Sequence, residues 1–98
     1  MNNYSREEFF WKIHISKHAM RRMKERKICL EDIYDTINDP YMYFYDSWND
    51  LYLAVNIRGY AVVYAFHGNI LEIVTVLGRR EFKALLSKYG SSRYKHLS

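Results

Sequence analysis

The sequence predicts an α+β domain: an antiparallel β-sheet of about four to five strands, with two helices before it and one after it. Three observations carry this prediction. Apolar residues recur with the period of a helix over residues 17–38, with the two-residue period of strands over 41–77, and with the helical period again over 79–89. At 98 residues, 49% of them hydrophobic, the chain can bury one core, so residues 1–98 are expected to form a single domain.

Residues 11–15 alternate apolar and polar side chains, which is typical of a short, half-buried strand. Ser16 follows and is a candidate N-cap, because its hydroxyl can accept a hydrogen bond from an amide two or three residues later. A helix is then expected over 17–27, with Ala19, Met20 and Met23 on its inner side.

A second, shorter helix is expected over 30–38. Pro40 ends it, because the residue before a proline disfavours helical geometry. A helix of this length is unstable alone and must dock on the rest of the protein. Its docking face consists of Leu30, Ile33, Tyr34 and Ile37.

Four strands are expected after this helix. Short turns separate them, including one at Arg58-Gly59, where glycine supplies a positive φ. Strands joined by such turns form an antiparallel meander, and we expect the helices to lie mainly on one face of it. The expected strands cover residues 41–45, 51–57, 60–66 and 70–77.

The apolar pattern of residues 79–89 predicts a last amphipathic helix, and Gly90 is expected to end it. The polar residues 91–98 are expected to form a poorly ordered tail, and residues 1–9 are also expected to be flexible.

The composition limits the classes of protein that the chain can belong to. Cys29 is the single cysteine, so no disulfide can form within the chain and a multi-cysteine zinc site is excluded. The first residues lack the apolar core of a signal peptide, and the apolar run 61–66 is far too short to span a membrane. We therefore expect a cytoplasmic protein with no membrane partner.

Charge is distributed unevenly along the chain. Residues 1–28 hold eight Lys or Arg and three acids, residues 29–57 hold six acids and no Lys or Arg, and residues 58–98 hold seven Lys or Arg and two acids. A clustered basic surface is typical of proteins that bind nucleic acid. The alternative is that the acidic middle segment packs beside the basic ones and evens out the surface.

The basic side of the first helix has a definite geometry. His18, Arg22 and Arg26 are four residues apart and therefore form a column along one face of the helix. Because stacked cations repel each other, this column needs an anion. That anion is either a ligand phosphate or an acid of the second helix, and the candidate acids are Asp32, Asp35 and Asp39.

These residues also carry a resemblance to a known family. The stretch 16–28 resembles the H-A-x-x-R-M-x-x-R-x-I signature of a bacterial family described as a domain of unknown function, and the resemblance extends over residues 12–78. The matching positions are His18, Ala19, Arg22, Met23, Arg26 and Ile28. One departure is that the last strand runs into Leu77-Gly78, where the family often continues into an aromatic residue.

That family is similar to RelE/BrnT-type toxins. The resemblance implies a RelE-like fold and a metal-independent endoribonuclease of a toxin–antitoxin type system, with no cofactor. Its partners would be RNA, in some cases on the ribosome, and a cognate antitoxin protein. The alternative is a non-catalytic module on the same fold that binds nucleic acid or a protein.

Metal-free RNA cleavage needs a base, an acid and cations for the phosphorane charge. Imidazole is a suitable base near neutral pH, which makes His18 a catalytic candidate together with Arg22 and Thr75. The alternative role of His18 is to fix the helix through a bond to a backbone group or a tyrosine, and that of Thr75 is ordinary strand packing. The nucleic-acid-binding candidates are Lys17, Arg21, Arg26, Arg79 and Arg80.

Other polar and aromatic residues are weaker candidates. His67 ends a strand beside a turn, where a histidine is usually only solvated, and Tyr52 and Tyr64 are better explained by core packing than by base stacking. His14 and His18 are four apart, but a strand–helix junction separates them, so the usual i, i+4 zinc geometry fails. We therefore predict no metal site.

Overall fold

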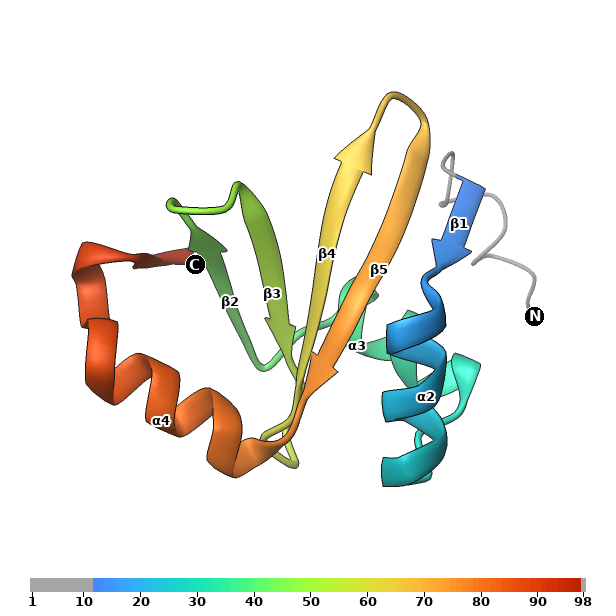
Figure 1. The fold of residues 1–98 in the computed structure, drawn as a ribbon, viewed down its shortest axis with the longest axis horizontal. Helices are drawn as coiled ribbons and strands as arrows, with labels where there is room; N and C mark the ends of the chain where they lie inside the picture. Colours follow the sequence, from blue (N-terminus) through green and yellow to red (C-terminus); the bar gives the residue numbers. More distant parts are fainter. Residues whose placement is uncertain (1–11, 98) are drawn as a thin grey trace.

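The computed structural model describes residues 12–97 (Figure 1). None of the helices in this part of the chain has the length and apolar character needed to cross a lipid bilayer. The elements, in chain order, are β1 (Lys12–Ile15), α2 (Lys17–Arg26), α3 (Leu30–Asn38), β2 (Met42–Asp46), β3 (Leu51–Val55), β4 (Ala61–His67), β5 (Ile70–Leu77), α4 (Arg79–Tyr89), the 3-10 turn η1 (Gly90–Ser92) and β6 (Tyr94–Leu97).

The strands form one six-stranded sheet in the order β1-β5-β4-β3-β2-β6. Strands β2 to β5 form the expected antiparallel meander, and β6 pairs antiparallel with β2. β1 instead pairs parallel with β5. The chain forms this edge strand before the helices and reaches its neighbour β5 only at the end of the meander. The sheet is therefore mixed, and the prediction of an antiparallel sheet with four to five strands was wrong in both respects.

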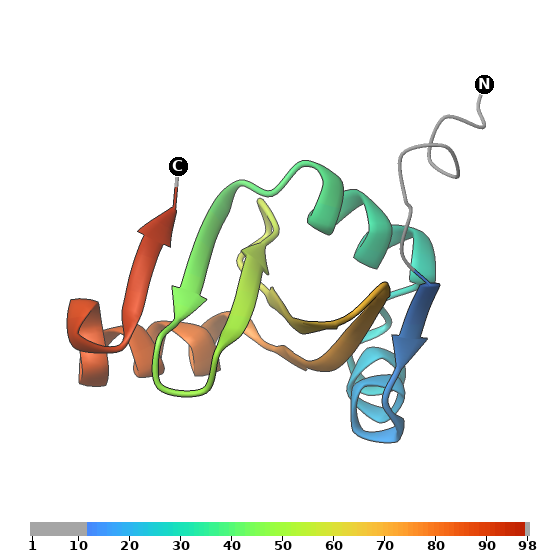
Figure 2. The same cartoon turned by 90° about the horizontal axis from the view of Figure 1, so that it is seen from above.

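The helices cover both faces of the sheet, so the prediction that they lie mainly on one face was also wrong. Figure 2 shows α3 on one side of the sheet and α4 on the other. The two faces of β3 and β4 explain this arrangement, because both are apolar. Ala54 and Val62 point into a core closed by α2 and α3, whereas Leu53 and Val63 point into a second core closed by Phe82 of α4.

The start of α2 is tied to β5 by the predicted N-cap. Ser16 Oγ accepts a hydrogen bond from the Ala19 amide at 3.0 Å and donates one to the Val74 carbonyl at 2.8 Å. Ala19 is fully buried and Met23 nearly so, as expected for the inner side of this helix, whereas Met20 is 56% exposed. The short link from β1 therefore places α2 beside β5 at the edge of the sheet (Figure 1).

Several predicted boundaries differ by one or two residues from the observed ones. α2 ends at Arg26, because Lys27 adopts a left-handed conformation with a φ of 56°. β3 ends at Val55 rather than at residue 57, and Gly59 has the positive φ expected of the following turn. Trp11 and the predicted flexible residues 1–9 lie outside the described residues.

The C-terminal segment differs most from the sequence-based expectation. Residues 94–97 form strand β6 instead of a poorly ordered tail. Arg93 anchors this strand, because its Nε and Nη2 donate hydrogen bonds of 3.0 and 2.9 Å to the two carboxylate oxygens of Asp46. The Arg93 guanidinium also lies 4.9–5.3 Å from three ring centroids, which belong to Trp48, Tyr89 and Tyr94.

Burial alone would raise the pKa of Asp46, whose side chain is 3% exposed. Hydrogen bonds from Arg93, Asn49 and the Trp48 amide outweigh that effect and lower the pKa of Asp46 below its ordinary value of 3.8. Because the folded pKa is depressed, the pair stabilises the fold above that ordinary value. This stabilisation is lost as the pH falls through the folded pKa.

Replacing Arg93 with alanine is expected to lower the free energy of unfolding by about 3 kcal/mol, because the Asp46 carboxylate would remain buried without its cation. Urea denaturation measures this, and Arg80→Ala, at an exposed arginine of α4, is the control, with an expected change below about 0.5 kcal/mol. The deficit of Arg93→Ala should shrink as the pH falls below 3.8 and then through the lowered pKa of folded Asp46. An equal deficit at neutral and acid pH would contradict this account.

Candidate functional site: the basic helix and the sheet face beside it

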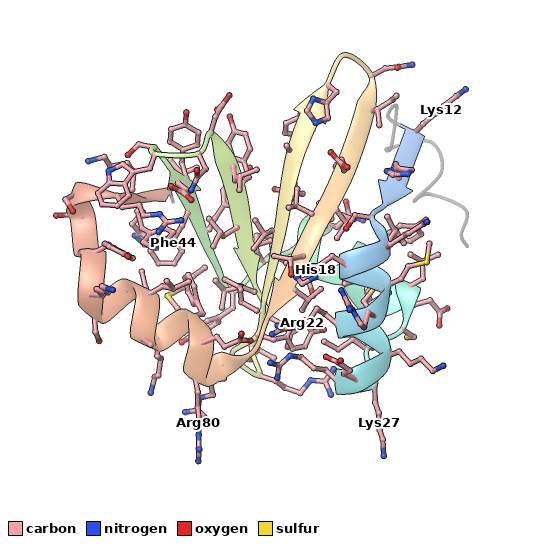
Figure 3. The ribbon with its side chains drawn as sticks, viewed as in Figure 1. Lys12, His18, Arg22, Lys27, Phe44 and Arg80 are labelled. Atoms are coloured by element: carbon pink, nitrogen blue, oxygen red, sulfur yellow. The ribbon has the colours of Figure 1, made fainter. Side chains whose placement is uncertain are left out.

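The arginines of the basic column find their anion on the last helix. Nη2 of Arg22 and Nη2 of Arg26 both donate to Oε1 of Glu81, and the Arg26 contact measures 2.6 Å. Figure 3 shows His18 and Arg22 on the side of α2 that faces β5 and α4, whereas Lys27 projects away from the domain. The predicted column therefore exists, and Arg22 and Arg26 join α2 to α4 through Glu81.

Glu81 serves the start of its own helix as well. Its Oε1 accepts a 2.8 Å hydrogen bond from the amide of Gly78, the N-cap residue of α4. Partial burial would raise the pKa of Glu81, but the Gly78 amide, the Arg22 hydrogen bond and the charges of Arg22 and Arg26 outweigh it and lower the pKa. This carboxylate therefore stays ionised and holds three donors from two helices.

Gly78 allows this close approach. A Cβ atom at position 78 would collide with the guanidinium group of Arg26, so this flexible end of the arginine side chain would have to move to admit any other residue there. The glycine that ends the strand pattern in the sequence is therefore also the surface against which the Arg26 side chain packs.

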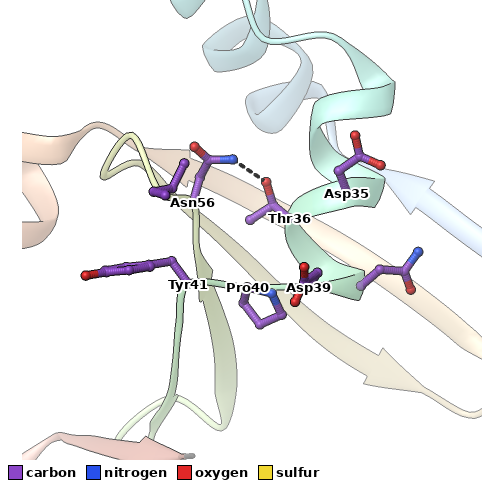
Figure 4. Close-up of a pocket in the computed structure, with 8 residues that line it drawn as sticks. Asp35, Thr36, Asp39, Pro40, Tyr41 and Asn56 are labelled. Carbon is purple, nitrogen blue, oxygen red and sulfur yellow. Dashed lines mark hydrogen bonds between the residues drawn. The ribbon is translucent and has the colours of Figure 1, made fainter.

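The hypothesis that Arg22 and Arg26 pair with the acidic second helix is wrong. Asp32 caps its own helix by accepting from the Cys29 amide at 3.0 Å, and its nearest cation is Arg58 at 3.8 Å. Asp35 and Asp39 line a separate polar cavity of about 730 Å³ at the end of α3, where Asn56 donates a 3.1 Å hydrogen bond to Thr36 (Figure 4). Sequence proximity favoured these acids, but α3 turns them away from α2.

His18 occupies the exposed first turn of α2. Its contact within the described chain is with Arg21, whose Nη2 lies 3.4 Å from His18 Nδ1. It does not bond a tyrosine or a backbone group among the described residues. The imidazole is therefore accessible from solvent. The nucleic-acid-binding candidates Lys17, Arg21, Arg26, Arg79 and Arg80 are exposed too, along α2 and at the start of α4.

Thr75 lies on β5 opposite Val63, on the face of the sheet where α4 packs. Its hydroxyl is buried and has no hydrogen-bond partner in the described chain, and the same holds for Nε of Arg22. Both polar atoms belong to elements that pack against each other, α2 and β5. Unpaired buried polar groups are uncommon, which makes these two of interest for ligand binding.

The same sheet face carries a group that the sequence analysis missed. Glu72 Oε1 lies 3.1 Å from His67 Nε2, and Glu72 Oε2 lies 3.7 Å from His14 Nδ1. The register places these residues on one face, because His14 pairs with Glu72, and Glu72 pairs with Ala65, two residues before His67. Thr75 shares this face, because a register shift between Val63 and Tyr64 pairs it with Val63, two residues before Ala65. We call this surface, defined by His14, His67, Glu72 and Thr75, the histidine face.

The alternation of residues 12–15 placed His14 on the polar side of its strand, but only the parallel pairing of β1 with β5 brings it beside Glu72. These side chains are not arranged as a metal site: among residues 12–97, no group of three or more His, Cys, Asp or Glu could hold a metal ion.

The aromatic residues considered for base stacking lie on the opposite face. Tyr52 stacks between Tyr43 and Tyr64, with centroid distances of 6.0 and 5.8 Å. Tyr64 is 3% exposed and donates a hydrogen bond to the Tyr43 hydroxyl, and burial raises its pKa. Core packing for Tyr52 and Tyr64 is therefore confirmed, and neither contributes to the histidine face.

The Glu81 contacts give a testable consequence for stability. Glu81→Gln is expected to lower the free energy of unfolding by about 1 kcal/mol, at the upper end for an exposed ion pair, because two arginines lose one shared carboxylate. The matched control is Glu25→Gln, an exposed glutamate of α2, with an expected change below about 0.5 kcal/mol in urea denaturation. Equal effects of the two substitutions would show that Glu81 does not join the helices.

In a comparison with protein-family models, residues 15–78 matched the domain of unknown function DUF4258. This span contains the His18–Arg22–Arg26 column, Glu72 and Thr75, and it ends before Glu81. No curated protein and no solved structure matched the chain. Since the matched span covers well over half of the sequence and includes the column and most of the histidine face, the chain belongs to the DUF4258 family.

Proposed function

We propose that this protein binds RNA and cleaves it without a metal ion, as a toxin-type endoribonuclease. The observation that carries the proposal is the position of α2 beside the histidine face. There, an exposed His18 accompanies two unpartnered buried polar atoms, Nε of Arg22 and Oγ1 of Thr75. Such a reaction requires a base, an acid and groups that bind the phosphate.

In the proposed reaction, His18 removes the proton from a ribose 2′-hydroxyl. The 2′-oxygen attacks the adjacent phosphorus atom, and the bond from phosphorus to the 5′-oxygen breaks. A protonated histidine of the histidine face, His14 or His67, gives its proton to the leaving 5′-oxygen. The products are a 2′,3′-cyclic phosphate and a 5′-hydroxyl, so protons and bonds balance without a cofactor.

Arg22 and Thr75 have the proposed task of holding the phosphate oxygens while negative charge accumulates on them. The guanidinium of Arg22 is already oriented by Glu81 through Nη2, which leaves its Nε–H for a ligand. A donor fixed in advance loses little entropy when the phosphate binds. Glu81 therefore supports the proposal even though it neutralises part of the basic column.

The family span adds support of a different kind. The signature residues His18, Arg22 and Arg26 all lie within residues 15–78, whereas Glu81, which holds the two arginines here, lies outside that span. In the proposed toxin–antitoxin setting, the partner would be an acidic or DNA-binding antitoxin protein that covers the basic surface of α2. The RNA substrate would reach the histidine face when this partner is absent.

The reaction predicts that the purified protein converts RNA into fragments with 2′,3′-cyclic phosphate ends in the presence of EDTA. His18→Ala is expected to reduce the cleavage rate by at least about a hundredfold, the usual contribution of one general base. His96→Ala, an exposed histidine of β6, should leave the rate unchanged. RNA that stays intact with the native protein, or is cleaved equally by His18→Ala, would refute the enzyme proposal.

A second candidate function is RNA binding without cleavage. The observation that favours it is that Glu81 shares its carboxylate between Arg22 and Arg26, which reduces the positive charge next to His18. In this case His18→Ala has no effect on RNA integrity, yet the protein still binds RNA.

Both candidate functions require phosphate contacts, and the salt dependence of RNA binding reports the number of these contacts. With a 2′-O-methylated RNA that cannot be cleaved, the logarithm of the affinity should fall linearly with the logarithm of the salt concentration. Its slope should decrease by about 0.7 for each phosphate contact that a substitution removes. Arg21→Gln and Lys17→Gln test this directly, and Lys88→Gln at the far end of α4 is the control. A binding constant indifferent to salt would contradict both candidates.

A further inference from the structure

A small cleft at the C-terminal end of α2 has a lining that the proposed cleavage does not use. It measures about 210 Å³ and lies where the end of α2, the β3–β4 turn and the start of α4 meet. Its lining includes four cations and no acidic residue. The lining residues are Arg26, Lys27, Ile28, Arg58, Tyr60, Gly78 and Arg79.

The charge around this cleft is not balanced by the protein. Arg26 shares Glu81 with Arg22, and Arg58 has only a long 3.8 Å contact with Asp32. Lys27 and Arg79 have no acidic partner within 4 Å in the described part of the chain. Cations held this close repel each other, and that repulsion is relieved when an anion enters.

The cleft also contains an unsatisfied hydrogen-bond donor. Tyr60 is 8% exposed, and its hydroxyl is buried without a partner among residues 12–97. Arg58 lies over its ring, with 5.7 Å between the guanidinium carbon and the ring centroid. A buried hydroxyl normally finds an acceptor, and a ligand oxygen in the cleft would supply one.

The local backbone keeps these groups in place. Gly59 has a φ of 102°, and a Cβ there would collide with the aliphatic part of the Arg79 side chain, which therefore lies directly over the turn. Arg79 is also the first residue of α4, where the helix dipole is positive. The positive end of an eleven-residue helix, four cations and a free hydroxyl thus converge on one cleft.

We propose that this cleft binds a phosphate group of a nucleic acid. Arginine forks and a lysine ammonium suit phosphate oxygens, and the Tyr60 hydroxyl would donate to one of them. The cleft is about 12 Å from His18 along α2, from the eight residues that separate His18 and Arg26. It therefore binds a phosphate remote from the proposed scissile one, and binding there does not require that the protein cleaves RNA.

The test uses short 2′-O-methylated RNA, which resists cleavage, in three forms: with a 5′-phosphate, with a 3′-phosphate and with neither. Fluorescence anisotropy gives each affinity, and inorganic phosphate serves as competitor. We expect inorganic phosphate to displace the RNA. We also expect Arg58→Gln and Lys27→Gln each to weaken binding about tenfold, the loss of one charge-assisted hydrogen bond. The RNA form whose affinity falls most on these substitutions shows whether the bound phosphate is terminal or internal.

Two further variants make the result specific. Tyr60→Phe removes only the hydroxyl and is expected to weaken binding about threefold to tenfold, as for one neutral donor. Lys88→Gln also removes one lysine charge, but far from the cleft. It should change the affinity for RNA only through the overall charge of the protein. Lys27 is exposed, so Lys27→Gln tests the site even if Arg58→Gln fails to fold. Equal affinities for Lys27→Gln and Lys88→Gln, or no competition by inorganic phosphate, would overturn the proposal.

Discussion

The carboxylate of Glu81 is the contact on which the arrangement of the basic residues depends. It accepts from Arg22 and Arg26 of one helix and from the Gly78 amide at the start of another. Because α2 belongs to the β1 edge of the sheet and α4 covers the opposite core, this one acid joins parts of the chain that share no other ion pair among the described residues. It also fixes the direction of the two guanidinium groups, which would otherwise repel each other.

The Glu81 contacts divide the basic surface of α2 into two parts with different surroundings. Toward the start of α2, His18 remains accessible beside the histidine face, where Arg22 Nε and Thr75 Oγ1 have no partners within the described residues. Toward the end of α2, Arg26 belongs to a cleft with three further cations. A nucleic-acid strand that follows the helix would meet a site suited to chemistry at one end and a site suited to holding a phosphate at the other.

Much of the fold could be predicted from the sequence because local periodicity determines it: α3 and α4 have the predicted bounds, and Ser16 is the N-cap of α2. The errors concern long-range pairing. Nothing in residues 12–15 indicates a parallel partner at 70–73, and β6 depends on the buried contact between Arg93 and Asp46, 47 residues apart. The column was predicted for the same reason as the helices, whereas its counter-ion Glu81 and the histidine face depend on contacts between distant strands and helices.

The most direct test of the central claim is to map an uncleavable RNA on the protein by backbone amide chemical shifts. The account predicts that the changes concentrate on four groups of residues: 17–28 of α2 and its end, 72–79 of β5 and the start of α4, 58–60 of the turn beside the cleft, and the neighbourhood of His14 and His67 on the histidine face. The aromatic face formed by Tyr43, Tyr52 and Tyr64 should remain unaffected. Chemical-shift changes confined to that aromatic face, or to the polar cavity lined by Asp35 and Asp39 beside α3, would contradict the account.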